Sequence, residues 1–141
     1  MLKNTPKILS PELLKVLAEM GHGETIIIAD ANFPALTVNA KHIIRADGLS
    51  ATDMLDAMLK VIPLDTFVND NVVMMAVPEG TATPTIWKEY EEICKKNDGN
   101  EKIVHLERFK FYDKAKDAVA VVYTGESRIY ANVIIQKGVI Q

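Results

Sequence analysis

The run Ile26-Ile27-Ile28-Ala29 constrains the fold of this chain more than any other stretch. Four consecutive apolar residues lie between the polar Thr25 and Asp30. Such a run is typical of a strand that is buried on both faces, as in a parallel sheet. In open α/β sheets, ligands bind outside the carboxyl ends of the strands. Asp30 ends this strand, and a carboxylate there is costly to bury without a partner, so we consider it a candidate binding residue.

Apolar runs and helical patterns alternate along the rest of the chain. Strands are predicted over residues 42–46, 72–77, 102–106, 119–123 and 133–135. Helices are predicted to start at Ser10-Pro11, Ser50 and Thr83-Pro84, and a polar-rich helical pattern covers 107–118. We expect Gly21 to end the first helix in the left-handed conformation. This alternation predicts one α/β domain over residues 1–141, with three layers and a mostly parallel sheet flanked by helices.

The composition excludes several classes of protein. The 141 residues are 48% hydrophobic and carry a net charge of −3, which gives no electrostatic footprint for nucleic acid. No stretch approaches the roughly 18 apolar residues of a membrane span, and the N-terminus lacks the apolar run of a signal peptide. With Cys94 as the single cysteine, neither an intramolecular disulfide nor a cysteine zinc cluster can form. We therefore expect a cytoplasmic protein with no nucleic-acid or membrane partner.

His22 stands between Gly21 and Gly23, which keep the backbone around it open. It is either a turn residue or an exposed acid/base, and the pattern alone leaves both interpretations open. Its intrinsic pKa of about 6.5 suits proton transfer at neutral pH. Because the histidines form no HxH or HExxH arrangement, we expect no metal site. The chain also lacks the GxSxG motif of a serine hydrolase.

Polar groups at the ends of predicted elements form a second set of candidates. The set combines a carboxylate, a guanidinium, a phenol and an amide, and its members are Asp30, Arg108, Tyr130 and Asn132. Such a mixture of donors and acceptors suits a polyhydroxylated ligand. In the alternative interpretation, Arg108 pairs with a surface acid such as Glu107 or Asp113, and Tyr130 is a packing aromatic. The residues alone leave that alternative open.

These segments resemble a known family, the sugar mutarotases that comprise L-fucose mutarotase and D-ribose pyranase. The resemblance spans nearly the whole chain. It is carried, in order, by residues 10–23, 30–35, 44–48, 108–112, 124–126, 130–132 and 137–139. Gly21-His22-Gly23, Arg45-Ala46-Asp47-Gly48 and Arg108-Phe109 resemble the fucose branch of the family. Tyr130-Ala131-Asn132 resembles the ribose branch at least as well.

The resemblance implies an isomerase that interconverts the α and β anomers of L-fucose by acid/base ring opening and closure, without a cofactor. It implies that His22 is the acid/base. It further implies a monosaccharide site lined by Asp30, Arg108, Tyr130, Ala131 and Asn132, and a ring-shaped homo-oligomer, a decamer. The alternatives are a D-ribose pyranase and a sugar-binding protein without turnover. Pure binding, however, would not need a residue with the pKa of a histidine.

Overall fold

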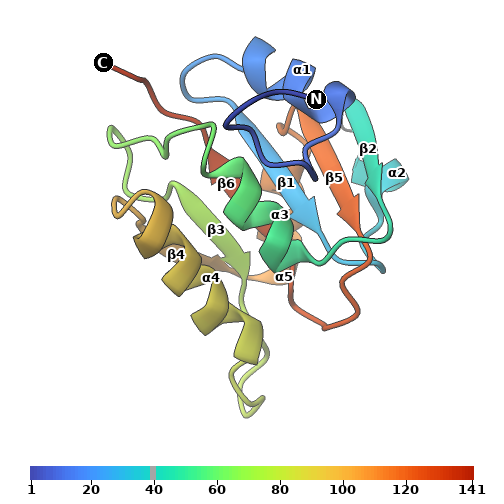
Figure 1. Ribbon diagram of the computed structural model, residues 1–141. Coiled ribbons are helices and arrows are strands. Elements are labelled where there is room, and N and C mark those ends of the chain that lie inside the picture. The colour runs from blue at the N-terminus through green and yellow to red at the C-terminus, as the bar shows by residue number, and fades with distance from the viewer. Residues whose placement is uncertain (39–40) are drawn as a thin grey trace.

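Six strands form one sheet in the order β2-β5-β1-β6-β3-β4 (Figure 1), in a computed structural model that describes residues 1–38 and 41–141. The strands are β1 (Thr25–Ala29), β2 (His42–Ala46), β3 (Val72–Met75), β4 (Ile103–Leu106), β5 (Ala120–Thr124) and β6 (Val133–Gln136). Five of these six run parallel, and β6 runs antiparallel to its neighbours β1 and β3. The prediction of a mostly parallel sheet is confirmed.

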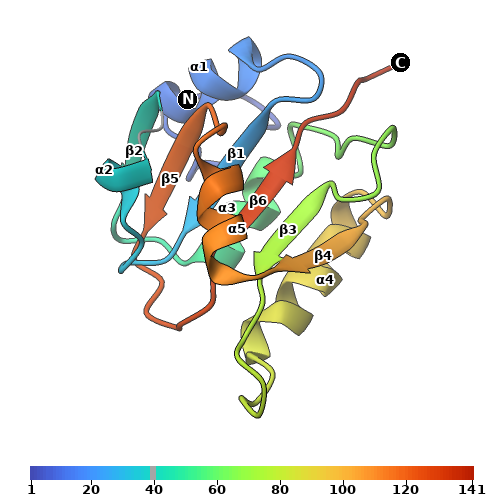
Figure 2. The same ribbon diagram turned by 180° about the vertical axis from the view of Figure 1, so that it is seen from behind.

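Helices cover both faces of this sheet and complete three layers. One face carries α1 (Pro11–Glu19), α3 (Ala51–Met58) and α4 (Thr85–Asn97), as Figure 1 shows. The other face carries α2 (Ala35–Val38) and α5 (Arg108–Ala115), which lie in front in Figure 2. The predicted fold class is therefore confirmed. Within residues 1–38 and 41–141, no helix combines the length and the apolar character needed to cross a membrane.

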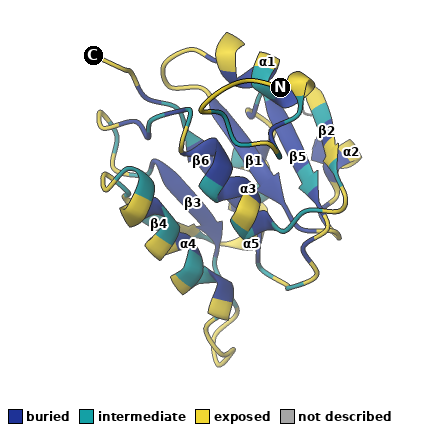
Figure 3. Ribbon diagram, in the orientation of Figure 1, coloured by how far each residue is buried: buried dark blue, intermediate teal, exposed yellow. Residues whose placement is uncertain are grey.

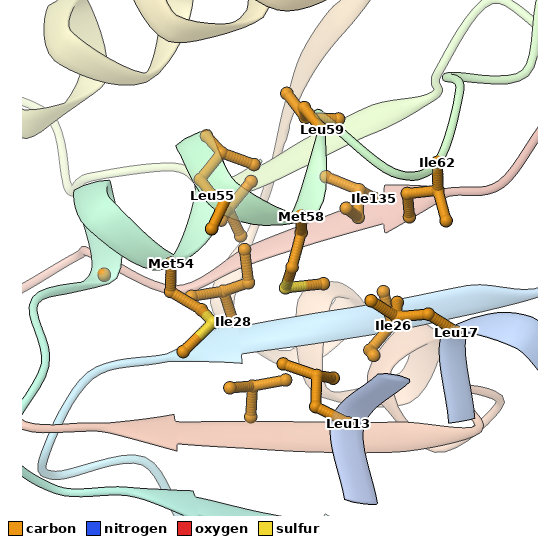
Figure 4. Close-up of a cluster of buried hydrophobic side chains, with 14 of the residues drawn as sticks. Leu13, Leu17, Ile26, Ile28, Met54, Leu55, Met58, Leu59, Ile62 and Ile135 are labelled. Atoms are coloured by element: carbon orange, nitrogen blue, oxygen red, sulfur yellow. The ribbon is translucent and has the colours of Figure 1, made fainter. Parts of the chain in front are cut away.

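The pleat of the strands divides the core into two parts. Ile26 and Ile28 point toward the layer of α1 and α3, where Figure 4 shows them among the leucines and methionines of these helices. Ile27 and Ala29 point toward α2 and α5. Every residue of β1 is buried, as expected for a strand covered on both faces (Figure 3). Full burial of each isoleucine contributes roughly 1.5–3 kcal/mol to folding.

Helix ends agree with the sequence pattern at two positions and differ at two others. The hydroxyl of Ser10 accepts from a backbone N–H at the start of α1, and Ser50 does the same for α3. In α4, Pro84 is itself the N-cap, without a side-chain hydrogen bond. The expectation for Gly21 is wrong, because α1 already ends at Glu19 and Gly23 is the residue with a left-handed φ of 84°.

Parallel strands give the sheet two chemically different edges. The carboxyl edge lies where the parallel strands end, at the arrowheads of β1, β3 and β5 in Figure 1. The amino edge lies where these strands begin. Because β6 runs the other way, it begins at the carboxyl edge and ends at the amino edge. This single reversed strand connects the two places at which the candidate site residues lie.

Candidate active site

The site residues predicted from the sequence lie at both edges of the sheet. Asp30 follows β1, Arg108 follows β4, and the segment 130–132 precedes the reversed strand β6, so these residues share the carboxyl edge. His22 precedes β1 and lies at the amino edge. At about 3.3 Å per residue, the strand between them spans roughly 15 Å. One chain therefore does not bring His22 and Asp30 together in one site.

Asp30 is the buried centre of the group that we call the carboxyl-edge cluster, formed by Asp30, Arg108, Tyr130 and Asn132. Asp30 is 6% exposed. Its backbone N–H donates to Oδ1 of Asn132 at 2.8 Å, and the N–H of Asn32 donates to Oδ1 of Asp30 at 2.8 Å. Burial raises the pKa of Asp30 above its ordinary value, although the hydrogen bonds from Asn32 and Asn132 oppose that rise. The negative charge of the nearby Glu126 carboxylate raises the pKa of Asp30 further.

The segment 130–132 has an unusual backbone. Tyr130 has a φ of 56°, in the left-handed region that residues other than glycine rarely adopt. Ala131 is fully buried, and its carbonyl accepts a hydrogen bond of 2.6 Å from the hydroxyl of Tyr90. Oδ1 of Asn132 is occupied by the Asp30 N–H, and the Asn132 side chain also hydrogen-bonds the Asp30 carboxylate, which leaves one amide hydrogen of Asn132 for another acceptor.

Arg108 is the exposed first residue of α5. Its guanidinium lies 5.7 Å from the ring centre of Tyr112, whose ring centre lies 6.0 Å from that of Phe33. Glu107 is the N-cap of the helix and accepts from the backbone N–H of Phe109. In the described part of the chain, Arg108 forms no ion pair with Glu107 or Asp113. The guanidinium is thus oriented by aromatic rings.

His22 contacts a buried carboxylate at the amino edge. Its Nε2 lies 3.0 Å from Oδ1 of Asp65, and the side chain of Asp65 is 2% exposed whereas that of His22 is 43% exposed. Asp65 also accepts from the backbone N–H of Phe67 at 3.0 Å and from Nε2 of Gln136 at 2.9 Å. The ring of Phe67 lies 5.2 Å from that of His22. We call His22, Asp65, Phe67 and Gln136 the amino-edge cluster.

The ionisation state of Asp65 fixes the hydrogen on His22. Burial alone would raise the pKa of Asp65, but hydrogen bonds from Phe67, His22 and Gln136 outweigh burial and lower it. An ionised carboxylate can only accept hydrogen bonds. Nε2 of His22 therefore carries a hydrogen, and Nδ1 is the free nitrogen of the neutral ring. A histidine held in one tautomer with its other nitrogen free can act as a general base.

Lys137, which directly follows β6, also holds the loop around His22. The N–H of Gly23 donates to the carbonyl of Lys137 at 2.9 Å. The ammonium of Lys137 donates to the carbonyls of Leu17 and Met20 at 2.8 and 2.6 Å, and so supplies a positive charge at the end of α1. The exposed His22 thus sits on a fixed backbone.

Sequence reasoning missed Asp65, Gln136 and Tyr112 as members or neighbours of these clusters. Asp65 lies in an irregular loop without a motif, and its only signal is an acid beside the apolar Leu64. Gln136 and Tyr112 follow ordinary strand and helix patterns. Among the described residues, no group of three His, Cys, Asp or Glu side chains could hold a metal ion.

Comparison with known proteins gives full-length matches. The model of the RbsD / FucU transport protein family matches residues 3–140. The chain is 48% identical to the fucose mutarotase of Mus musculus, covering 97% of this chain and 94% of that protein. It is 46% identical to the L-fucose mutarotase of Actinobacillus pleuropneumoniae, covering 99% of this chain and 97% of that protein.

Two solved structures bound to sugars can be compared with the fold. The fucose mutarotase of Streptococcus pneumoniae in complex with L-fucose superposes with a TM-score of 0.94 at 42% identity, covering 99% of this chain and 100% of that chain. RbsD of Bacillus subtilis complexed with D-ribose superposes with a TM-score of 0.75 at 26% identity, covering 100% of both chains.

Proposed function

Because the chain belongs to the RbsD / FucU transport protein family, we propose that it is an isomerase that interconverts the α and β anomers of L-fucose. One observation carries this proposal: over nearly its full length the chain is 45–50% identical to proteins named fucose mutarotase. Its fold is also more similar to the L-fucose complex than to the D-ribose complex, with TM-scores of 0.94 and 0.75. These findings favour L-fucose over D-ribose as the substrate.

The reaction breaks and re-forms the bond between the anomeric carbon and the ring oxygen, and proton transfer is the only assistance that these steps need. A pyranose opens when its anomeric hydroxyl loses a proton and its ring oxygen gains one. The aldehyde then rotates, and the ring closes on the other face by the reverse transfers. In this proposal, Nδ1 of His22 takes and returns the proton. Asp65 accepts from Nε2 and stabilises the imidazolium that forms. One positioned acid/base contributes roughly 10²–10⁴ in rate.

The carboxyl-edge cluster supplies groups that match sugar hydroxyls. The carboxylate of Asp30 accepts hydrogen bonds, while the amide of Asn132 and the guanidinium of Arg108 donate them. The hydroxyl of Tyr130 can do either. Ala131 contributes its backbone, and its N–H already lowers the pKa of Asp30. In this proposal, these residues bind the sugar that His22 acts on.

The separation of the two clusters favours a site shared between copies of the chain. His22 lies at the amino edge and Asp30 at the carboxyl edge, with the length of β1 between them. We propose that a complete site forms where the amino edge of one copy meets the carboxyl edge of another, in a ring-shaped homo-oligomer, a decamer in the cytoplasm. Activity then depends on assembly.

NMR saturation transfer between the α and β anomers tests the function directly. We expect the protein to accelerate exchange of L-fucose anomers more than interconversion of D-ribose forms. His22→Ala should lose roughly two to four orders of magnitude in exchange while keeping the fold and the assembly. Exchange in His22→Ala within a few-fold of the unmutated protein would return His22 to the role of a turn residue. Faster conversion of D-ribose would favour a ribose pyranase, and sugar binding without exchange would favour a binding protein.

Mixed assemblies test the shared site. His22→Ala and Asn132→Ala subunits, each inactive alone, are mixed under conditions that allow the rings to reassemble. If the site is shared, some boundaries in the hybrid hold an intact His22 and an intact Asn132, so exchange should reappear. Mixed rings that form but stay inactive would show that both residues serve the same subunit's site.

A further inference from the structure

Side chains of α4 contact the segment that carries Tyr130 and Asn132. Nε1 of Trp87 donates to the carbonyl of Tyr130 at 3.1 Å, and the hydroxyl of Tyr90 donates to the carbonyl of Ala131 at 2.6 Å. Trp87 and Tyr90 are three residues apart and therefore lie on the same face of the helix. Two consecutive carbonyls of one segment are thus each fixed by a donor from the same helix.

A third contact from α4 anchors the loop just before this segment. Glu89 pairs with the guanidinium of Arg128, which also bonds to the buried carboxylate of Glu126. The backbone of Glu126 in turn accepts from the N–H of Ala31, next to Asp30. The loop between β5 and β6 is therefore tied to α4 on one side and to the end of β1 on the other.

The two carbonyl contacts lie on the carboxyl side of the strained residue Tyr130. Tyr130 has a φ of 56°, and a residue other than glycine persists there only when its surroundings determine its conformation. The hydrogen bonds to the carbonyls of Tyr130 and Ala131 fix the peptide planes on its carboxyl side. Without them, the backbone would relax toward a negative φ and the phenol of Tyr130 would point elsewhere.

Both donors are themselves held firmly. Tyr90 is fully buried, and burial holds the pKa of its hydroxyl far above the usual range, so the hydroxyl stays protonated and able to donate. The indole of Trp87 packs against the imidazole of His105 on β4, with ring centres 4.2 Å apart. The indole is thus fixed between His105 on β4 and the carbonyl of Tyr130.

We propose that Trp87 and Tyr90 are positioning residues of the sugar site, which hold Tyr130 in its left-handed conformation and thereby aim Tyr130 and Asn132 at the sugar. Neither residue touches the reacting atoms in this arrangement. The inference rests on the proposed function for the identity of the sugar. It adds that affinity for the sugar depends on a helix whose residues no sequence pattern marks as part of the site.

The variant Tyr90→Phe removes one hydroxyl and keeps the aromatic ring. The buried carbonyl of Ala131 then loses its donor, and the segment 130–132 gains freedom that sugar binding must remove. We expect the Kd for L-fucose, measured by isothermal titration calorimetry, to rise roughly tenfold. The exchange rate at saturating L-fucose should stay within about twofold, because the variant leaves His22 and Asp65, which serve the proton transfer, unchanged. Trp87→Phe should likewise raise the Kd for L-fucose and leave the exchange rate at saturation within about twofold.

Cys94→Ala is the matched control. Cys94 is fully buried on α4, one helical turn beyond Tyr90, so this variant also weakens the packing of the helix. It leaves the hydrogen bonds of Trp87 and Tyr90 in place. Hydrogen exchange of peptides covering residues 125–132, followed by mass spectrometry, should accelerate in Tyr90→Phe and stay unchanged in Cys94→Ala. The Kd of Cys94→Ala for L-fucose should equal that of the unmutated protein.

The outcomes separate this inference from the proposed function. Unchanged hydrogen exchange over 125–132 in Tyr90→Phe overturns the inference, since the segment would then be held by other contacts. Faster hydrogen exchange with an unchanged Kd also overturns it and leaves Tyr90 a purely structural residue. Equal losses of affinity for L-fucose in Cys94→Ala and Tyr90→Phe also overturn the inference. If the unmutated protein binds L-fucose without exchanging its anomers, the proposed function fails, while the Kd comparison still decides the role of α4.

Discussion

Replacing Asp65 by asparagine tests whether this buried carboxylate supports the chemistry of His22. The substitution keeps the size of the side chain and one oxygen that can accept from Nε2 of His22. It removes the negative charge. The carboxamide of Gln136 can turn so that its oxygen faces the new amide, so most hydrogen bonds around position 65 can be retained. The fold should therefore persist, and the substitution should mainly slow the proton transfer.

The expected decrease in the exchange rate follows from the difference between a hydrogen bond to a charged group and one to a neutral group. A hydrogen bond to a charged group is worth about 1.5–3 kcal/mol and a neutral one about 0.5–1.5 kcal/mol. In Asp65→Asn, the imidazolium of His22 that forms during exchange faces a neutral oxygen, so the transition state loses about 1–1.5 kcal/mol. That corresponds to a rate roughly tenfold lower. The effect is smaller than the loss expected for His22→Ala, because the base itself remains.

The stability of the variant has a pH dependence with a defined sign. The pKa of Asp65 is lower in the folded protein than its ordinary value of about 3.9. Ionised Asp65 therefore stabilises the fold above about pH 4, and this contribution is lost as the pH falls through the folded pKa. The difference in free energy of unfolding between the unmutated protein and Asp65→Asn should shrink below pH 4. Denaturant unfolding at several pH values measures it.

Asp56→Asn is the control for this measurement. Hydrogen bonds from Lys60, Lys96 and Asn97 lower the pKa of Asp56. The difference in free energy of unfolding between the unmutated protein and Asp56→Asn should therefore also shrink at low pH. Asp56 lies on α3, away from both clusters, and the rate of anomer exchange should be unchanged. A rate in Asp65→Asn within twofold of the unmutated protein at pH 7 would refute the role of Asp65 as the partner of His22.

The remaining predictions concern binding and packing. Asp30→Asn and Arg108→Ala should each weaken L-fucose binding by about 1–3 kcal/mol in calorimetric titration; unchanged affinity would remove that residue from the site. Gly138→Ala should lower the free energy of unfolding by about 1–3 kcal/mol, because the new Cβ would lie 2.5 Å from the carbonyl oxygen of Leu64 and 2.8 Å from Cα of Asp65. Gly48→Ala, whose Cβ would meet no atom within 4 Å, should be close to neutral in the same denaturant unfolding; equal losses in both variants would contradict the steric reasoning.

The elements that the sequence predicted correctly are those with long, uniform patterns. Buried strands such as 26–29 are recognisable because every residue must be apolar when both faces are covered. The direction of β6 was not predictable, since the run Val133-Ile134-Ile135 is compatible with either direction and only its long-range partners decide. The four-residue helix α2 was also missed, because it covers about one helical turn and is too short for an apolar pattern to repeat.

The candidate site was predictable where residues directly follow a strand or flank a turn. Asp30 and His22 could be singled out in this way, and the structure places them at opposite ends of β1. Asp65 could not, because it is 43 residues from His22 and its contact depends on the path of an irregular loop. Trp87 and Tyr90 follow the ordinary apolar pattern of a helix, and nothing in that pattern marks their polar atoms as donors to another segment.

The central position of β6 has a consequence for how the protein folds. β6 follows the other five described strands in the chain, yet it lies between β1 and β3. Until it docks, the strands can form only two separate pieces, β2-β5-β1 and β3-β4, each with an open edge. Asn132 at its start meets Asp30, and Gln136 at its end meets Asp65. Docking of β6 therefore joins the two pieces into one sheet and completes both clusters at once.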